Sequence, residues 1–280
     1  MRSVSPRADA AHAGTAAFAQ GRRGLVRLGR FGYGAKGVVY VVLGAMALQA
    51  AFEAGKEAPG TQGALREIAD KPLGEFLLWL LAAGLIGHAL WRLVQAVRDT
   101  ERKGNDTKGL TIRTGYIISA AIHVSLAVAA AAIARGRPTR ANSEQSLTAD
   151  LMAMPFGRWL VAAIGLIVLG VGISQLYQAY SARFRERLRT AEMTPKEQRW
   201  AIRSGRAGYA ARGITFGVIG VFLINAARQF DPQEAKGLAG ALQTLENQPH
   251  GQWLLAIVGL GLLGYGVFQF ILARYRRMVV

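Results

Sequence analysis

The four-residue segment Arg30–Tyr33, which reads RFGY, opens a long apolar run and recurs twice in the chain. It returns as RTGY at Arg113–Tyr116 and as RAGY at Arg206–Tyr209, at spacings of 83 and 93 residues, and each copy again opens an apolar run. A second signature, Pro-x-Gly with an aromatic residue two positions after the glycine, opens the next apolar run each time; it occupies residues 72–76, 155–159 and 249–253. Because the two signatures alternate three times, the sequence predicts three tandem copies of one two-helix unit.

The apolar runs are long enough to cross a membrane. A helix needs about 20 mostly apolar residues to span the hydrocarbon core, and six stretches qualify: Tyr33–Ala51, Phe76–Val97, Tyr116–Ala134, Trp159–Tyr180, Tyr209–Ala227 and Trp253–Ala273. Overall, 51% of the residues are hydrophobic although 34 are Lys or Arg, a combination that requires the apolar residues to be sorted into blocks. The sequence therefore predicts an all-α integral membrane protein, with six transmembrane helices arranged as three tandem two-helix hairpin repeats with approximate threefold pseudo-symmetry.

Charged residues are distributed unequally between the two sides of the predicted membrane. The connections on one side, together with both termini, contain 25 Lys and Arg and 7 Asp and Glu, whereas the other side contains 9 and 10. Basic residues favour the cytoplasmic side, so we expect both termini and the connections around Lys103 and Lys196 in the cytoplasm of a bacterial plasma membrane. The net charge of +17 is thus typical of membrane topology, and we expect no binding of nucleic acid.

The repeat boundaries follow from these spans. We expect a disordered cytoplasmic tail over residues 1–24, hairpin repeats over 25–100, 108–183 and 203–276, and a basic cytoplasmic linker over 184–202. Ahead of each Pro-x-Gly signature, Leu and Ile residues three or four positions apart predict a short amphipathic helix on the outer membrane surface. Pro is favoured in the first turn of a helix, where its missing N–H would be unpaired anyway, so we expect it to open each even-numbered span.

The triple paired-span unit, with its Arg-x-Gly-Tyr and Pro-x-Gly-x-aromatic signatures, resembles the bacterial membrane family that carries the domain of unknown function 1206. The resemblance covers the chain from about Leu25 to Tyr275. It implies a fold of three paired helices and no particular activity. The middle copy departs most, because it has Ser119 where the other copies have Lys36 and Arg212.

Polar side chains inside the predicted spans are candidates for function. Counting 18 residues from the glycine of each Pro-x-Gly signature gives Arg92, Gln175 and Gln269, one long polar side chain per repeat. A threefold axis would either gather these side chains into an intramembrane polar ring or place each one at a contact between repeats. Interhelical hydrogen bonding, or extension of the side chain toward the headgroups, is the alternative to a role in binding a substrate.

A second set of polar residues lies near the predicted cytoplasmic boundary. An inner basic collar is formed by Arg30, Lys36, Arg113, Arg206 and Arg212. Anionic lipid headgroups are the natural counter-charges for such residues, at about 1 kcal/mol for each one near the surface. Ordinary anchoring of the cytoplasmic helix ends explains most of the collar without a specific lipid site.

Two histidines, His88 and His123, fall at similar depths on neighbouring spans, roughly 13 and 11 Å from the inner ends at about 1.5 Å per residue. Two imidazoles on adjacent helices can ligate a haem iron. The pair is not repeated in the other copies, and two histidines are a weak signal without a surrounding ligand motif. We therefore favour a hydrogen-bonded interhelical pair, and we expect the protein to have no cofactor and no metal.

The sequence contains no signature of an enzyme. It lacks HExxH, a Gly-rich phosphate loop ahead of a helix, a serine elbow and any carboxylate pair inside a span, and the lack of cysteine excludes disulfides and thiolate chemistry. We expect a non-catalytic plasma-membrane protein that acts through contacts with the lipid bilayer or with a protein partner. The basic connection Arg183–Arg206, which contains Trp200, favours this hypothesis because it can lie on the inner leaflet. A small transporter or channel along the repeat axis is the alternative, and a haem-binding redox protein is the third hypothesis.

Overall fold

The computed structural model describes residues 6–53, 56, 58–101, 104–137 and 143–278. Its long helices are α1 (Pro6–Phe52), α3 (Gly74–Arg98), α4 (Thr107–Ala134), α6 (Gly157–Ser181), α7 (Pro195–Gln229) and α9 (Gly251–Tyr275). Its short elements are the helices α2 (Thr61–Ala69), α5 (Ser143–Met152) and α8 (Leu238–Glu246) and the 3₁₀ turns η1 (Arg183–Arg187), η2 (Thr190–Glu192) and η3 (Pro232–Glu234). The six long helices are long and apolar enough to cross a membrane, which confirms the predicted fold class.

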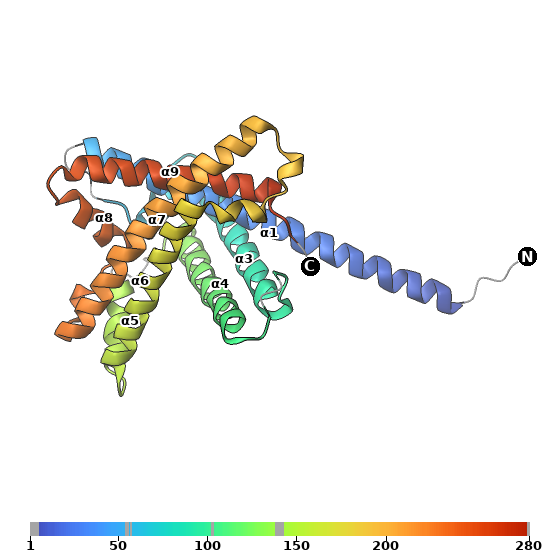
Figure 1. The fold of residues 1–280 in the computed structure, drawn as a ribbon, viewed down its shortest axis with the longest axis horizontal. Coiled ribbons are helices and arrows are strands. Elements are labelled where there is room, and N and C mark those ends of the chain that lie inside the picture. The colour runs from blue at the N-terminus through green and yellow to red at the C-terminus, as the bar shows by residue number, and fades with distance from the viewer. Residues whose placement is uncertain (1–5, 54–55, 57, 102–103, 138–142, 279–280) are drawn as a thin grey trace, which may run out of the picture.

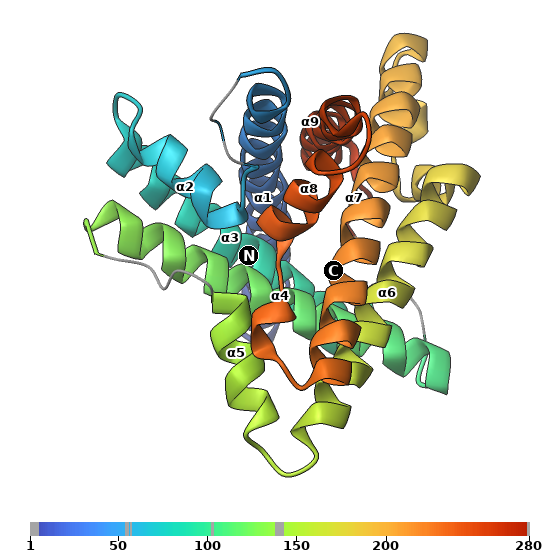
Figure 2. The same ribbon diagram turned by 90° about the vertical axis from the view of Figure 1, so that its left-hand side faces the viewer.

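The long helices pack in three pairs, and each pair joins two different copies of the repeat (Figures 1 and 2). Helix α3 packs along α4, α6 along α7, and α9 along α1, so the second span of each copy lies beside the first span of the next. The contact between α9 and α1 joins the last copy to the first. The pairs are inclined to one another in Figure 1 and do not run parallel.

The outward faces of these pairs are apolar. On α4 and α6, the side chains of Ile122, Val128, Leu166 and Ile173 are each more than half exposed, with exposed fractions of 59%, 62%, 61% and 62%. Apolar surface of this extent is not stable in water, but it is the normal surface of a helix that faces lipid. The protein is therefore a multi-span membrane protein.

The glycine of the Arg-x-Gly-Tyr signature lets two helices of one copy touch. A Cβ atom on Gly32 would lie 2.5 Å from the backbone nitrogen of His88 in α3, and one on Gly208 would lie 2.5 Å from Cα of Tyr265 in α9. A Cβ atom on the equivalent Gly115 would meet nothing within 4 Å, because α4 and α6 have almost no contact with each other over their described residues. The middle copy therefore departs from the other two in packing as well as in sequence.

The Pro-x-Gly signatures form the same turn three times. The residue between Pro and Gly has a positive φ in every copy, at Leu73, Phe156 and His250. The helix begins at the glycine and not at the proline, so the expectation that Pro opens the helix is wrong. Pro lies instead at the second position of a turn, where its fixed φ fits. A Cβ atom on the glycine would come within 1.7 to 2.1 Å of a carbonyl oxygen of the preceding short helix, which explains why glycine is needed.

Two segments outside the spans differ from expectation. Helix α1 begins at Pro6, so residues 6–24 are helical where a disordered tail was expected; residues 1–5 lie outside the described part of the chain. The segment is rich in Ala, the strongest helix former. Helix α7 begins inside the predicted linker, because Thr194 and Glu197 form a capping box at its start.

Candidate functional site at the basic ends of the helices

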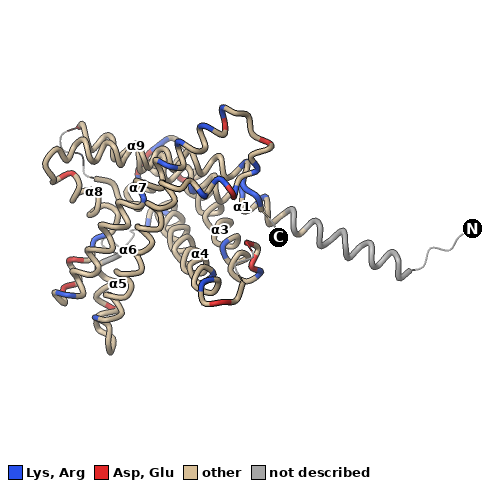
Figure 3. Tube along the Cα trace, in the orientation of Figure 1, with Lys and Arg blue, Asp and Glu red and all other residues tan. Residues whose placement is uncertain are grey.

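The basic ends of the helix pairs meet in one region. Figure 3 shows Lys and Arg residues gathered where α1 and α9 meet the beginning of α7. Within it, Arg113 in α4 donates from Nε to the Ala96 carbonyl of α3 at 2.6 Å, and Arg206 in α7 donates from Nε to the Ala179 carbonyl of α6 at 2.9 Å. Since the last carbonyls of a helix lack intrahelical partners, these two arginines cap the second span of the preceding copy.

The equivalent Arg30 does not repeat this contact. Its Nε atom has no hydrogen-bond partner in the described part of the chain. The end of α9 is capped instead by Arg189, from the connection before α7, which donates from its guanidinium to the Arg274 carbonyl at 2.8 Å. Of the three signature arginines in the predicted inner basic collar, Arg113 and Arg206 thus cap the C-terminal end of a helix, and Arg30 caps none of the described helix ends.

Lys36 and Arg212, the other members of the collar, lie further inside. Lys36 is 7% exposed, and its Nζ lies 6.0 Å from the ring centre of Tyr40 and 5.8 Å from that of Tyr265. The Arg212 guanidinium lies 5.6 and 4.6 Å from the same two ring centres and donates to the Tyr265 hydroxyl. The two cations thus share one pair of tyrosines. Aromatic rings attract a cation and offset part of the cost of burying its charge.

The tyrosines of the three Arg-x-Gly-Tyr signatures all interact electrostatically with one arginine. Arg187 in η1 lies within electrostatic range of Tyr33, Tyr116 and Tyr209. These tyrosines belong to α1, α4 and α7, the first span of each copy. A residue of the connection before α7 thus interacts electrostatically with the signature tyrosine of every copy.

One carboxylate, Glu101, lies in the same region. It accepts hydrogen bonds from Gln95 Nε2 and from the Tyr116 hydroxyl, both at 2.8 Å, and forms an ion pair with Arg276 at 2.6 Å. Burial opposes the ionisation of this carboxyl, but the charges of Arg276 and Arg187 outweigh burial and hold its pKa below its usual value. Glu101 is therefore ionised at neutral pH and bonded to three other segments of the chain.

Arg276 reaches Glu101 because the C-terminal segment pairs with the connection before α7. Leu188 and Arg276 form an antiparallel bridge, and the backbone N–H of Arg277 donates to the Arg187 carbonyl at 2.9 Å. The Arg276 guanidinium then lies 5.1 Å from the ring centre of Tyr33. Sequence reasoning missed these contacts, because Arg187, Arg276 and Glu101 lie outside the spans and belong to no repeated signature.

We call the set of Lys36, Arg92, Arg187, Arg212 and Arg276 the basic centre. Lys36 lies within electrostatic range of Arg92, Arg212 and Arg276. Arg92, Arg187 and Arg276 all act on Glu101. The centre thus draws on α1, α3, α7, the connection before α7 and the C-terminal segment.

The predicted polar ring is not joined by hydrogen bonds between its members in the described part of the chain. Arg92 donates to Gln95 Oε1 at 3.2 Å, and its guanidinium lies 5.2 Å from the ring centre of Tyr116 in α4. Gln175 and Gln269 are 9% and 1% exposed, and their Oε1 atoms have no partner among the described residues. Arg92 therefore lies at a contact between copies one and two, and the roles of the two glutamines stay predictions.

His88 and His123 lie in direct contact, with ring centres 4.5 Å apart. Nδ1 of His123 lies 2.6 Å from the Ser119 carbonyl, so it carries the ring proton, whereas neither ring nitrogen of His88 has a partner in the described residues. The two histidines are thus interhelical neighbours, and a hydrogen bond is found among the described residues for His123 alone. A haem iron bound by both rings would lie between them with the porphyrin, and rings in contact leave no room for it.

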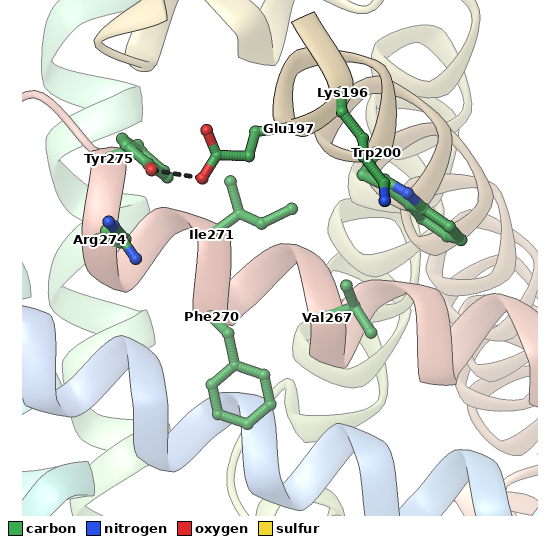
Figure 4. A pocket seen from close by; sticks show the side chains of 8 residues that line it. All are labelled: Lys196, Glu197, Trp200, Val267, Phe270, Ile271, Arg274 and Tyr275. Carbon is green, nitrogen blue, oxygen red and sulfur yellow. Dashed lines mark hydrogen bonds between the residues drawn. The ribbon is translucent and has the colours of Figure 1, made fainter. Parts of the chain in front are cut away.

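A groove lies between the beginning of α7 and the end of α9 (Figure 4). Its volume is about 350 Å³, and Trp200, Val267 and Ile271 contribute apolar surface to it. Lys196 and Arg274 also line it, and both are exposed. Glu197 lines the groove as well, and its carboxylate accepts a hydrogen bond from the Tyr275 hydroxyl at 2.6 Å. The groove at the basic ends of the helices thus combines apolar surface with two exposed cations and one carboxylate that the protein itself already engages.

The comparisons with known proteins agree with the repeat structure. The family model for the Domain of Unknown Function DUF1206 matches residues 31–99, 114–182 and 207–276. The chain is 38% identical over 252 residues to "Uncharacterized protein YxxB" of Bacillus subtilis (strain 168), with 90% of this chain and 91% of that protein covered. No solved structure was found to match the chain. The predicted resemblance is confirmed, and the chain belongs to the DUF1206 family, with three copies of its domain.

Proposed function

We propose that this protein is a non-catalytic membrane protein that binds anionic phospholipids of the inner leaflet at the basic ends of its helices. The observation that carries the proposal is the groove between α7 and α9, which combines apolar surface with two exposed cations, while its one carboxylate, Glu197, is engaged by the Tyr275 hydroxyl. Trp200 at this groove is 55% exposed. Tryptophan is enriched at the level of the lipid headgroups, so its position suits a groove that opens at the membrane interface.

The groove suits the two chemical parts of a phospholipid. Val267 and Ile271 offer apolar contact for an acyl chain, and burial of each methylene contributes about 0.8 kcal/mol. Lys196 and Arg274 offer positive charge for the phosphate, at about 1 kcal/mol for each basic residue near an anionic surface. Binding of this kind needs no catalytic group.

The distribution of charge supports the inner leaflet as the source of the lipid. The side of the membrane that holds the groove has 25 of the 34 Lys and Arg residues. Basic connections remain in the cytoplasm, where the adjacent leaflet contains anionic lipids. The two cations of the groove would therefore face the anionic lipids of the inner leaflet.

A channel along the repeat axis has less support. Ion pathways are lined by polar groups that face water, whereas Gln175 and Gln269 are both buried. The charged side chains of Arg187 and Arg276 do not supply a polar pathway through the membrane either, because both residues lie outside the spans, near the signature tyrosines at the basic ends of the helices.

The test is to identify the lipid that stays bound to the purified protein. Protein extracted from vesicles of equal parts phosphatidylglycerol and phosphatidylcholine should retain mainly phosphatidylglycerol in native mass spectrometry. The double variant Lys196→Gln, Arg274→Gln should lower retention at this site by about thirtyfold, because the two charges together contribute about 2 kcal/mol. The control pair Lys71→Gln, Arg137→Gln, from the opposite ends of the helices, should leave retention unchanged. Equal retention of both lipids, or equal losses in both double variants, would overturn the proposal.

A further inference from the structure

The basic centre carries more positive charge than its surroundings balance. Among the residues that the structure describes, Glu101 alone forms an ion pair with a member of the centre, through Arg276. Lys36 and Arg276 are only 7% and 4% exposed. Like charges in a partly buried region repel one another, and a buried charge without a partner is costly. A bound anion would remove both costs.

Each of Arg92, Arg212 and Arg276 makes one side-chain hydrogen bond, yet a second donor of each guanidinium lacks an acceptor among the described residues. The Nε atoms of Arg92, Arg212 and Arg276 are buried, and within the described ranges they have no partner; the same holds for the Tyr33 hydroxyl. Most buried donors in proteins are hydrogen-bonded. Four buried donors from four segments of the chain therefore indicate an acceptor that the protein itself does not supply.

We propose that the basic centre binds one phosphate-bearing anion. Guanidinium groups match the oxygens of a phosphate in pairs, and a phosphate offers several acceptors together with negative charge. Arg92, Arg187 and Arg212 are each partly exposed, so the anion enters from the basic ends of the helices. The phosphate of an anionic lipid headgroup and a free phosphate from the cytoplasm have this same chemistry.

This site goes beyond the lipid groove and is separate from it. Arg212 lies sixteen residues after Lys196 in α7, about 24 Å further along the helix at about 1.5 Å per residue, and shares the rings of Tyr40 and Tyr265 with Lys36. Lys196 and Arg274 of the groove are not members of the basic centre. Variants of one site should therefore leave the other intact, and either proposal can fail without the other.

The experiment uses the full chain in detergent after removal of bound lipid. Its melting temperature is measured while inorganic phosphate replaces chloride at constant ionic strength, and separately while phosphatidylglycerol replaces phosphatidylcholine in mixed micelles. We expect at least one of the two probes to give a saturable rise in melting temperature, because an anion that binds only the folded state stabilises it. Arg212→Met and Arg276→Met should each weaken the apparent affinity by about tenfold. Lys71→Met, a matched control at the opposite helix ends, should not change it.

The two probes identify the source of the anion. A rise with phosphate alone indicates a soluble anion, and a rise with phosphatidylglycerol alone indicates a headgroup; both results support the site. The double variant Lys196→Gln, Arg274→Gln should keep the rise, which separates this test from that of the groove.

A further measurement excludes a purely structural role for the cations. With neither probe present, Lys36→Met and Arg212→Met should melt at or above the wild-type temperature, because each removes repulsion within the centre. If Arg212→Met does not fold, Arg212→Lys keeps the charge, loses the paired donors and should bind more weakly than wild type. No rise with either probe, or the same rise in wild type and in the folded Arg212 variant, would overturn the proposal.

Discussion

Arg276 and Glu101 lie 175 positions apart in the chain, yet their side chains form an ion pair of 2.6 Å at the basic ends of the helices. The pair joins the C-terminal segment to the connection that follows α3. Together with the packing of α9 along α1, it links the last copy of the repeat to the first. The link between the first and the last copy is thus held in part by a contact outside the repeated signatures.

Protonation of Glu101 should weaken the ion pair with Arg276 and lower the stability of the protein. Burial opposes its ionisation, but Arg276 and Arg187 hold its folded pKa below the usual value, so the unfolded chain binds the proton more tightly. The contribution of Glu101 to stability is therefore complete above about pH 4.3 and is lost as the pH falls through the lower folded pKa. Between about pH 5 and pH 3, the melting temperature of wild type should fall more steeply than that of Glu101→Gln. Parallel pH profiles for the two proteins would contradict the assignment.

The signature glycines should respond differently to the same substitution. Gly208→Ala should lower the free energy of unfolding by about 1–3 kcal/mol, because its Cβ would meet the backbone of Tyr265. Gly115→Ala should be neutral or raise it by up to about 1 kcal/mol, since Ala is the better helix former and its Cβ meets nothing. Denaturant titration in mixed micelles measures both values. Equal destabilisation by the two substitutions would show that the middle copy is packed like the third.

The parts of this fold that could be predicted from sequence are the local ones. The length of an apolar run and the spacing of two short signatures suffice for six helices and three repeats, because each signal lies within its own helix. The choice of helix partners could not be predicted, since apolar faces carry no mark of the helix that covers them. The hydrogen bonds of Arg113 and Arg206 to carbonyls of a neighbouring helix could not be predicted either. Every residue has a backbone carbonyl, so the sequence does not show which carbonyl accepts a hydrogen bond.

The same limit applies to the candidate site. Lys36 and Arg212 could be found because they occupy equivalent positions in two copies. Arg187 and Arg276 could not be found, since they lie in segments without a repeat and reach the site only through the antiparallel bridge between Leu188 and Arg276. Contacts between distant segments need the folded chain.

The helix-capping role of Arg206 should appear as a loss of stability. Arg206→Leu removes two donors from the carbonyls of Ala179 and Tyr180 and should cost about 1–2 kcal/mol. Arg203→Leu on the same helix is the control, because no hydrogen bond of the Arg203 side chain is found among the described residues, and it should be nearly neutral. Thermal unfolding measures the stability of both variants. Equal losses of stability would show that Arg206 contributes only through its positive charge and not through its hydrogen bonds to the carbonyls.

Two buried glutamines, Gln269 and Gln95, should respond differently to apolar replacement. Gln269→Leu removes a buried Oε1 atom that has no partner in the described part of the chain, so stability should stay constant or rise by up to about 1 kcal/mol. Gln95→Leu breaks the hydrogen bond to Glu101 and should cost about 1–3 kcal/mol. If Gln269 lines a pathway, wild-type protein in liposomes would show an ion flux that Gln269→Leu abolishes without loss of stability. We expect no such flux.

Both proposals require the basic ends of the helices to lie in the cytoplasm. The chain has no cysteine, so Lys108→Cys, Lys196→Cys and Lys71→Cys each introduce a single thiol. In intact cells, a membrane-impermeant maleimide should label the thiol at position 71, while those at positions 108 and 196 should react only after the membrane is opened. Labelling at position 108 or 196 in intact cells would contradict the account, because the groove and the basic centre would then face away from the inner leaflet.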